Sequence, residues 1–526
     1  MSKNSNLIYI FFIITYLIVG IFLSITNGIT SDEYFEQLNW EKNLSGIKSL
    51  IKNGNYDQFL EYQDKYHGIA FHYISQPIQF LTYKFVSQLN NISHSGAYLI
   101  SKHSVVFSIF FISGIFFYLI CIKLTNNKIF SFTSSSIYLL YPYLYGHAQF
   151  NMKDIPFLSA WLISTYYSLN IIEDFFFDKK IKIKKIIIIS FLTSFLISIR
   201  ILGLVIFLQY LISFIILFNV KNINFLKFIK DNYKKTLLLF LSLLIFIYIM
   251  NPVLWLNPLE LINSIKWMSN YFNNICTLTL GECMSSLSLP SSYYFIWLFF
   301  KLPIVILFGI VLFPLVEKKI FSNNILSIYY GTLLISFFSI LLLFILMRIN
   351  IYDELRHIMF IIPLIFLISL TNIYFLNKKF SHIISAIFIL FFIFENISLK
   401  SYQYTWLNSF SKFTEIEKNF EVDYWGVSNK NLNKKVVEYV NKNSISKDIC
   451  VYGDEYVKDF LITEGFKCFK MYNELDSAKI RPALAYKNLR NAKRSDPRDC
   501  KLIWNETYRY SFYKKDISVG TLWFCN

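Results

Sequence analysis

Long apolar runs recur through most of this 526-residue chain, and they limit its fold more than any other feature. A helix needs about 18 consecutive apolar residues or more to cross the hydrocarbon core of a bilayer. The chain is 55% hydrophobic with a mean hydropathy of +0.44, which exceeds that of an ordinary soluble domain. We therefore predict an all-α polytopic membrane protein.

The apolar runs divide into about eleven candidate spans. They cover residues 7–29, 99–124, 129–145, 156–172, 186–199, 201–218, 236–254, 293–315, 325–347, 358–376 and 382–394. The stretch 186–218 is too long for one span, so we expect a hairpin with Arg200 at its turn. The first run is long for a signal peptide and lacks a small-x-small cleavage site, so we expect a retained helix.

Lysine and arginine are distributed unevenly between alternate loops. One set of loops contains Lys3, Lys123, Lys128, the lysines of 179–185 and 221–235, Lys318, Lys319, Lys378 and Lys379. The short loops of the other set contain only Lys153, Arg200, Lys266, Arg348 and Arg356. Positively charged loops stay in the cytoplasm, so we predict that the N-terminus is cytoplasmic and the C-terminus outside the plasma membrane. This placement, rather than a nucleic-acid partner, accounts for the net charge of +17.

The composition changes after about residue 395. Residues 1–395 form the predicted membrane domain, and 396–526 form a small outside domain of α/β or α+β type, with candidate elements at 436–440, 449–452, 466–471 and 502–504. The first outside loop, 28–98, is too long for a connector, so we expect short helices on the membrane surface.

Six of the seven cysteines lie in segments placed outside, where disulfides can form. Cys276–Cys283 is the pair that proximity favours. Cys450–Cys468 and Cys500–Cys525 are further candidates, because spacing alone does not fix connectivity. The alternative is that these thiols are unpaired.

An acidic pair, Asp32-Glu33, directly follows the first apolar run. Carboxylates at the end of a span are costly to desolvate unless they face water or a partner. A carboxylate here can act as a general base or hold a divalent cation such as Mg²⁺ or Mn²⁺. The alternative is a solvated helix end. Asp32 is the stronger catalytic candidate, because Glu33 points in another direction.

A second polar loop, 145–156, lies between two predicted spans. Lys153 suits a phosphate near a helix N-terminus. Asp154 either caps the following helix or forms a second acidic wall of the site, where it could share a metal ion with Asp32. His147 is either a site residue or a hydrogen-bonded structural group, and His67 and His72 of the first loop are weaker candidates.

Cationic side chains form a third group on the outside. Arg200 lies at the hairpin turn, and Arg356-His357 precedes a late span. A guanidinium at membrane level needs an anion, and a lipid phosphate is one. The alternatives are ordinary lipid headgroups or an internal pair of Arg356 with Asp353 or Glu354.

Together these motifs resemble the GT-C superfamily of polytopic glycosyltransferases, in particular the branch of protein O-mannosyltransferases and bacterial dolichyl-phosphate-mannose-transferase-like enzymes. The resemblance spans about 7–394 and rests on Asp32-Glu33, the loop 150–157 with its Lys153-Asp154-Ile155-Pro156, Ser198-Ile199-Arg200 and Glu354-Leu355-Arg356-His357. The tail segment 420–426 is similar to one that follows the last span in some bacterial members. The chain lacks a signature of the β-trefoil of the eukaryotic enzymes.

The resemblance implies inverting transfer of a sugar from a polyprenyl-phosphate donor on the non-cytoplasmic face. It implies Asp32 as the base, with Asp154 as an acidic partner and Glu33 as a further candidate. Lys153, Arg200, Arg356 and His357 become candidate ligands of the donor phosphate. The acceptor is left open as a glycan, a lipid or a protein.

Two other classes remain open at this stage. A transporter or flippase of a lipid-linked glycan would carry functional charges inside its spans near the midplane, whereas these acids gather on one side. A non-catalytic assembly partner, whose exported tail is the working part, would tolerate Asp32→Asn.

Overall fold

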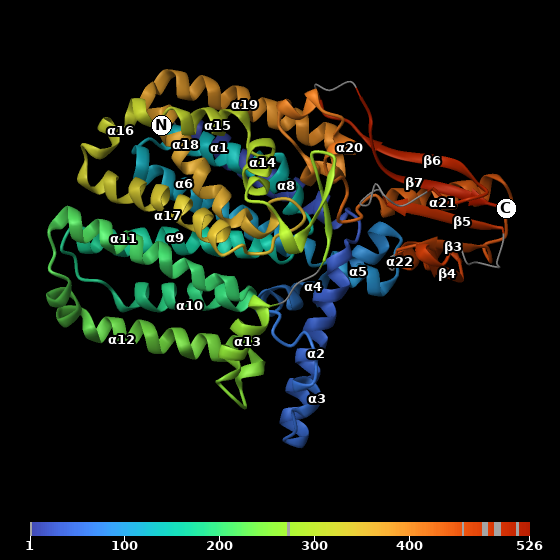
Figure 1. Cartoon of the computed structure of the whole chain (residues 1–526), viewed down its shortest axis with the longest axis horizontal. Coiled ribbons are helices and arrows are strands. Elements are labelled where there is room, and N and C mark those ends of the chain that lie inside the picture. The colour runs from blue at the N-terminus through green and yellow to red at the C-terminus, as the bar shows by residue number, and fades with distance from the viewer. Residues whose placement is uncertain (1–2, 271–273, 455–456, 476–481, 489–495, 512–514) are drawn as a thin grey trace.

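The computed structural model describes residues 3–270, 274–454, 457–475, 482–488, 496–511 and 515–526. A bundle of long helices makes up most of the molecule, and a small β-sheet domain projects from one end of the bundle (Figure 1). The membrane part comprises α1 (Lys3–Ile25), α6 (His103–Thr125), α7 (Lys128–Leu140), α8 (Pro142–His147), α9 (Asp154–Phe176), α10 (Ile183–Ile199), α11 (Ile206–Lys221), α12 (Phe225–Met250), α14 (Ser292–Lys301), α15 (Ile304–Val311), α16 (Phe313–Phe321), α17 (Asn324–Leu346), α18 (Ile362–Leu376) and α19 (Lys378–Leu399).

Every predicted span is helical, but the count of eleven is not confirmed. Within the described residues, seven helices are long and apolar enough to cross a membrane, or eight if α14 and α15, which meet at 116°, form one broken span. Helices α7 and α10 have 13 and 17 residues. The predicted span 129–145 is two helices, α7 and α8, because Pro142 begins a new helix.

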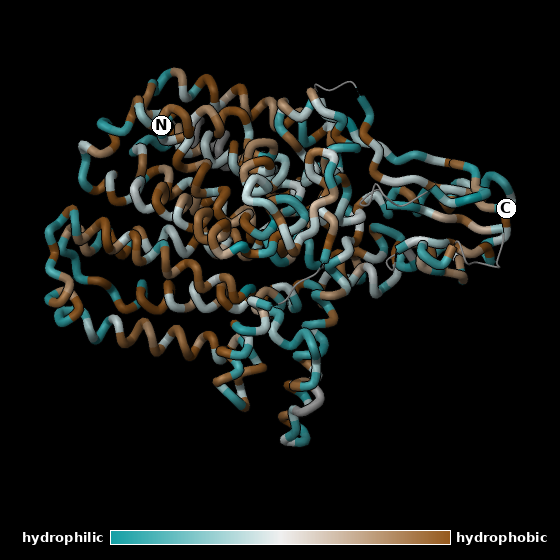
Figure 2. The backbone as a smooth tube through the Cα atoms, in the orientation of Figure 1, coloured by the Kyte–Doolittle hydropathy of each residue, from teal (hydrophilic) through white to brown (hydrophobic). Residues whose placement is uncertain are grey.

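Apolar residues run along most helices of the bundle (Figure 2), and many large apolar side chains there are exposed, as expected for a polytopic membrane protein. Helix α12 lies at one edge and exposes large apolar side chains such as Phe240, Leu241 and Ile245. In a soluble protein such a surface would be a liability, whereas here it suits contact with lipid tails. Helices α9 and α18 are largely buried at the centre.

The predicted hairpin turn at Arg200 is confirmed. Arg200 has an extended backbone between α10 and the 3₁₀ helix η1 (Ile201–Val205), which leads into α11. The first outside loop folds into α2 (Ser31–Asn53), α3 (Asp57–Leu60), α4 (Ala70–Asn90) and α5 (His94–Ile100). The expectation of short helices was wrong for α2 and α4, which have 23 and 21 residues.

The C-terminal domain contains a five-stranded mixed sheet in the order β4-β3-β5-β7-β6. Its strands are β3 (Cys450–Gly453), β4 (Cys468–Met471), β5 (Ala483–Asn488), β6 (Cys500–Tyr508) and β7 (Ile517–Cys525). Strands β4, β3 and β5 are parallel, and β5, β7 and β6 are antiparallel. Further helices are α13 (Glu260–Ser269), α20 (Ile416–Asn419), α21 (Asn429–Lys442), which packs on the sheet, and α22 (Val457–Leu461).

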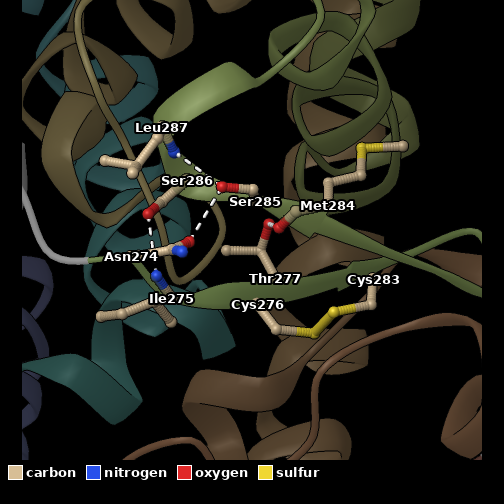
Figure 3. Close-up of a disulfide and its surroundings, with 9 residues drawn as sticks. All are labelled: Asn274, Ile275, Cys276, Thr277, Cys283, Met284, Ser285, Ser286 and Leu287. Atoms are coloured by element: carbon tan, nitrogen blue, oxygen red, sulfur yellow. Dashed lines mark hydrogen bonds between the residues drawn. A yellow bond between two sulfur atoms is a disulfide. The ribbon is translucent and has the colours of Figure 1, made fainter.

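All three predicted disulfides are confirmed. Cys450 and Cys468 are directly opposite each other on β3 and β4, as are Cys500 and Cys525 on β6 and β7. Cys276–Cys283 joins β1 (Cys276–Thr279) to β2 (Glu282–Ser285), a hairpin whose base is held by Ser285 and Ser286 (Figure 3). Cys121 is buried and unpaired.

Candidate active site

Charged side chains from four separate elements meet at the end of the bundle that carries the C-terminal domain. Asp32 is in the first turn of α2, and Asp154 is the first residue of α9. Arg200 follows α10, and Arg356 begins the 3₁₀ helix η4 (Arg356–Ile361) that leads into α18. Asp154, Arg200 and Arg356 lie at the ends of apolar bundle helices, so their polar heads reach one interface, where the polar helix α2 contributes Asp32.

Arg356 is at the centre of this cluster and is only 8% exposed. Its Nη2 donates to Asp32 Oδ2 at 2.7 Å, and its Nη1 donates to Asp353 Oδ2 at 2.9 Å. Its Nε lies 3.4 Å from Asp154 Oδ2. A buried guanidinium is stable here because three carboxylates compensate for its desolvation. The internal pair with Asp353 is thus present, but it is one contact of three.

The loop before Arg356 has an unusual backbone. Asp353 and Glu354 both have positive φ angles, 55° and 65°, although neither is glycine. Such conformations cost of order 1–3 kcal/mol each and persist only where the surroundings impose them. The burial of both side chains and their ion pairs supplies that constraint.

Asp154 is held by a second arginine. Arg200 Nη2 lies 2.5 Å from Asp154 Oδ1, and Asn151 Nδ2 donates to Asp154 Oδ2 at 2.8 Å. The Asn151 side chain also accepts from the backbone N–H of Asp154 at 2.8 Å. Asp154 therefore bridges Arg200 and Arg356. The N-cap position of α9 is Lys153 rather than Asp154, and the Asn151 side chain binds the first N–H group of the helix.

Lys153 extends the cluster toward the first outside loop. Its Nζ donates to Glu36 Oε1 at 2.7 Å and lies 3.4 Å from His67 Nδ1. Burial, together with Lys153 and Arg200, lowers the pKa of His67 to about 2. The ring of a neutral His67 can accept a hydrogen bond from the Lys153 ammonium group, and it lies beside the predicted phosphate ligands.

Glu33 and His72, also predicted as possible site residues, make structural contacts away from the cluster. Glu33 is buried, accepts from the N–H and hydroxyl of Thr30 at 2.8 and 2.9 Å, and pairs with His103 at 3.0 Å. It therefore caps α2 and points away from Asp32. His72 binds the buried Lys102 at 3.0 Å.

Two further histidines support the site from behind. His147 is fully buried between Asn151 at 3.0 Å and the Tyr424 hydroxyl at 3.1 Å, and burial lowers its pKa well below the usual range. His357 accepts from the backbone N–H of Tyr352 at 3.4 Å, and the two rings pack edge to face.

A second ion pair lies beneath the cluster. Lys301 Nζ of α14 lies 2.6 Å from Glu354 Oε2, and neither side chain is exposed. Lys301 also lies over the rings of Tyr143 and Trp297, at 4.5 and 5.7 Å from their centroids. Burial raises the pKa of Glu354 to about 7, although Lys301 opposes that rise. This pair fixes the strained loop that carries Asp353 and Arg356.

The sequence reasoning missed Glu36, Lys301 and Trp425. Glu36 is one helical turn after Asp32, so recognition of 31–53 as one helix would have placed both acids on one face. Lys301 interrupts an apolar run, which is a signal of a buried partner. Trp425 lies in the tail segment 420–426, which the family resemblance includes, but the resemblance gives that segment no role in the site.

The sequence leaves open a divalent cation at Asp32 and Asp154, and the donor set does not fit one. Mg²⁺ or Mn²⁺ requires carboxylate oxygens that face the ion, whereas both carboxylates face Arg356. In the described ranges, no group of three or more His, Cys, Asp or Glu side chains is arranged to hold a metal ion. No step below involves one.

A small hollow of about 30 Å³ lies next to the cluster, on the side of His67. Its walls come from the loop 65–69, the loop 251–254 and α13, together with Asn43 of α2 and Ile197 of α10. The lining combines apolar side chains with a few amide and hydroxyl groups.

No protein-family model and no curated relative matches the chain. Among solved structures, ArnT from Cupriavidus metallidurans in the apo state aligns with a TM-score of 0.50 at 9% identity, over 99% of this chain and 98% of that chain. The same protein bound to undecaprenyl phosphate aligns with a TM-score of 0.47 at the same identity and coverage. The chain shares the overall fold of apo ArnT. The likeness agrees with the predicted polytopic helical architecture, and it does not favour the mannosyltransferase-like branch.

Proposed function

We propose that this chain is a membrane glycosyltransferase that moves a sugar from a polyprenyl-phosphate donor to an acceptor hydroxyl on the non-cytoplasmic face. One observation carries the proposal. On a GT-C-like fold, the Asp32 carboxylate is 40% exposed and lies 2.7 Å from Arg356, with Asp154 and Arg200 directly behind. An accessible carboxylate next to clustered cations provides both a base and a phosphate site.

The proposed reaction is a single displacement with inversion. Asp32 takes the proton of the acceptor hydroxyl while the hydroxyl oxygen attacks the anomeric carbon. The bond between that carbon and the phosphate oxygen breaks, and its electron pair stays on the polyprenyl phosphate. Arg356, Arg200 and Lys153 stabilise the charge of the leaving phosphate, since guanidinium and ammonium groups bind phosphate strongly.

Because Asp32 is paired with Arg356, the donor phosphate has to bind before Asp32 can act as the base. A donor phosphate that binds Arg356 competes with the Asp32 carboxylate, which is the most exposed of the three partners of Arg356. Displaced from Arg356, Asp32 becomes available to the acceptor. Asp154 and Asp353 are buried and remain as counter-ions that hold the guanidinium in place.

The donor and acceptor are proposed only by class. ArnT is a GT-C glycosyltransferase and has been crystallised with undecaprenyl phosphate, so this lipid is the first carrier to test. The sugar is a hexose or a pentose, and the acceptor is a glycan, a lipid or a protein. Within these classes, we include a mannosyl donor and a protein acceptor. We also propose that the protein lies in the inner membrane with its N-terminus in the cytoplasm.

The transporter reading lacks an observation in its favour. The charges gathered here are at the ends of α2, α9 and α10 and the start of η4, rather than at the midplane of the helices.

A panel of sugar donors tests the proposed enzyme activity directly. Membranes that contain the protein are incubated with undecaprenyl-phosphate-linked radiolabelled sugars, and transfer to lipid, glycan and protein fractions is measured against membranes without it. Transfer from at least one donor supports the proposal, and no transfer from any donor by the inserted protein contradicts it.

A further inference from the structure

A turn that follows the last membrane helix enters the candidate site from the C-terminal side. Residues 423–428 form this turn, which we call the Asp423–Ser428 turn. Asp423 and Gly426 have positive φ angles of 42° and 75°. The Asp423 carboxylate accepts from the backbone N–H groups of Val427 at 2.7 Å and Ser428 at 2.9 Å, and from the hydroxyl of Tyr404. The turn is thus a rigid, internally bonded unit.

Trp425 at the tip of the turn contacts the centre of the site. The guanidinium carbon of Arg356 lies 4.5 Å from the centroid of the Trp425 ring, and Trp425 is only 3% exposed. A cation over an indole face is attracted to it, most strongly in a desolvated setting. The carboxylates of Asp32, Asp154 and Asp353 contact the nitrogens at the edge of the guanidinium. The Trp425 ring, together with the Tyr352 ring at 5.4 Å from the guanidinium carbon, limits the plane in which the group can lie.

The backbone and the neighbour of Trp425 make two more connections. The Trp425 carbonyl accepts from the backbone N–H of Ser31 at 3.1 Å, the residue next to Asp32. The Tyr424 hydroxyl lies 3.1 Å from His147 Nε2 and 3.5 Å from Glu354 Oε2. One turn therefore contacts the start of α2, the end of α8 and the loop that carries Arg356.

We propose that Trp425 is a positioning residue of the phosphate site, holding the Arg356 guanidinium in the plane in which it meets both Asp32 and the donor phosphate. The C-terminal segment is then part of the active site rather than an appended module. This inference rests on the proposed function, because it assigns donor-phosphate binding to Arg356.

The chain offers a matched control. Trp504 of β6 is in the same domain and also lies under a cation, with Lys435 Nζ 4.4 Å from its ring centroid, but it is partly exposed and belongs to the outer sheet. Trp504→Leu removes the same kind of contact away from the site. Trp425→Phe keeps an aromatic face for Arg356, and Trp425→Leu removes that face while keeping an apolar side chain.

The experiment measures the Kd of the full-length proteins for undecaprenyl phosphate in detergent, together with their thermal unfolding. We expect wild type and Trp504→Leu to bind equally, Trp425→Phe to bind within about threefold of wild type, and Trp425→Leu to bind about tenfold more weakly. In a transfer assay, Trp425→Leu should raise the KM for the donor more than it lowers kcat.

Three results would overturn the inference while leaving the proposed function standing. The first is wild-type affinity in Trp425→Leu, and the second is an equal loss of affinity in Trp504→Leu. The third is that Trp425→Phe and Trp425→Leu have the same thermal stability and the same affinity. A wild-type protein that neither binds undecaprenyl phosphate nor transfers any sugar would overturn the proposed function, and this inference with it.

Discussion

At the scale of single residues, Arg356 determines the arrangement of the site. Its three nitrogens face three different carboxylates, Asp32, Asp353 and Asp154. A lysine has the same charge, but its ammonium is a point charge without the planar fork of donors. The site therefore depends on the shape of the guanidinium as well as on its charge.

Arg356→Lys tests this dependence. We expect sugar transfer to fall about 100-fold or more, because loss of an oriented donor to developing charge costs roughly 10²–10³ in rate. Steady-state transfer by the purified variant is the measurement. Arg348→Lys, an exposed site shortly before the same loop, is the control and should transfer like wild type. Equal activity of Arg356→Lys and wild type would show that charge alone suffices.

The sequence indicated most of the charged residues of this cluster, but it could not indicate the direction of each side chain. Asp32, Lys153, Asp154, Arg200 and Arg356 were predicted as site residues, and the structure brings all five into one cluster. Glu33 was included on adjacency, but successive helix residues point in different directions, and its carboxylate caps α2 instead. Their catalytic and binding roles stay predictions until they are tested.

At the scale of elements, the loop between α17 and η4 depends on one buried ion pair. Lys301 of α14 binds Glu354 with no exposure of either side chain. Removal of one partner leaves an uncompensated buried charge, which costs about 3–5 kcal/mol, whereas removal of both leaves none. The pair is the structural support of the strained backbone at Asp353 and Glu354.

A double-mutant cycle of Lys301→Met and Glu354→Gln tests the coupling between these two side chains. We expect Lys301→Met alone to lower the free energy of unfolding by about 3 kcal/mol or more, and the double variant to recover a large part of that loss. Reversible unfolding in mixed micelles would measure the four proteins. Additive losses in the double variant would contradict the coupling.

The positions of the apolar helices could be predicted from the sequence, but the number of membrane spans could not. Hydropathy located each apolar helix, because the bilayer imposes a length that the sequence must meet. It could not show that Pro142 divides one run into α7 and α8, or that α14 and α15 meet at 116°. The long helices α2 and α4 were missed for another reason: their low apolar content hides them from a search for spans.

At the scale of the whole molecule, the C-terminal domain is docked on the membrane part through α22 and α5. Asp459 of α22 accepts from the hydroxyls of Ser93 and Ser95 at 2.6 and 2.7 Å, and its backbone carbonyl accepts from the Ser93 N–H at 3.0 Å. The pairing of these distant segments was not predictable, since nothing in either local sequence refers to the other.

This contact predicts a pH dependence. Burial raises the pKa of Asp459 from its ordinary value of 3.8 to about 6. A raised pKa in the folded state means that the contact is most stable at pH below about 4, where Asp459 is protonated in both states. The stability is lost as pH rises through 6. Asp459→Asn should remove this dependence, so wild type should become less stable than the variant above pH 6.

Limited proteolysis of the docked domain between pH 4 and 7 would measure the effect. Asp448→Asn, at a largely exposed aspartate of the same domain, is the control and should follow wild type. A pH profile of Asp459→Asn that matches wild type would show that Asp459 does not carry the dependence.

The most direct test of the account is sugar transfer by Asp32→Asn. With an undecaprenyl-phosphate sugar that wild type accepts, we expect Asp32→Asn to transfer at least about 100-fold more slowly, since general base catalysis contributes roughly 10²–10⁴. Glu41→Gln, at an exposed acid of the same helix, should transfer like wild type. Transfer by Asp32→Asn at the wild-type rate would remove Asp32 from the chemistry and contradict the central claim.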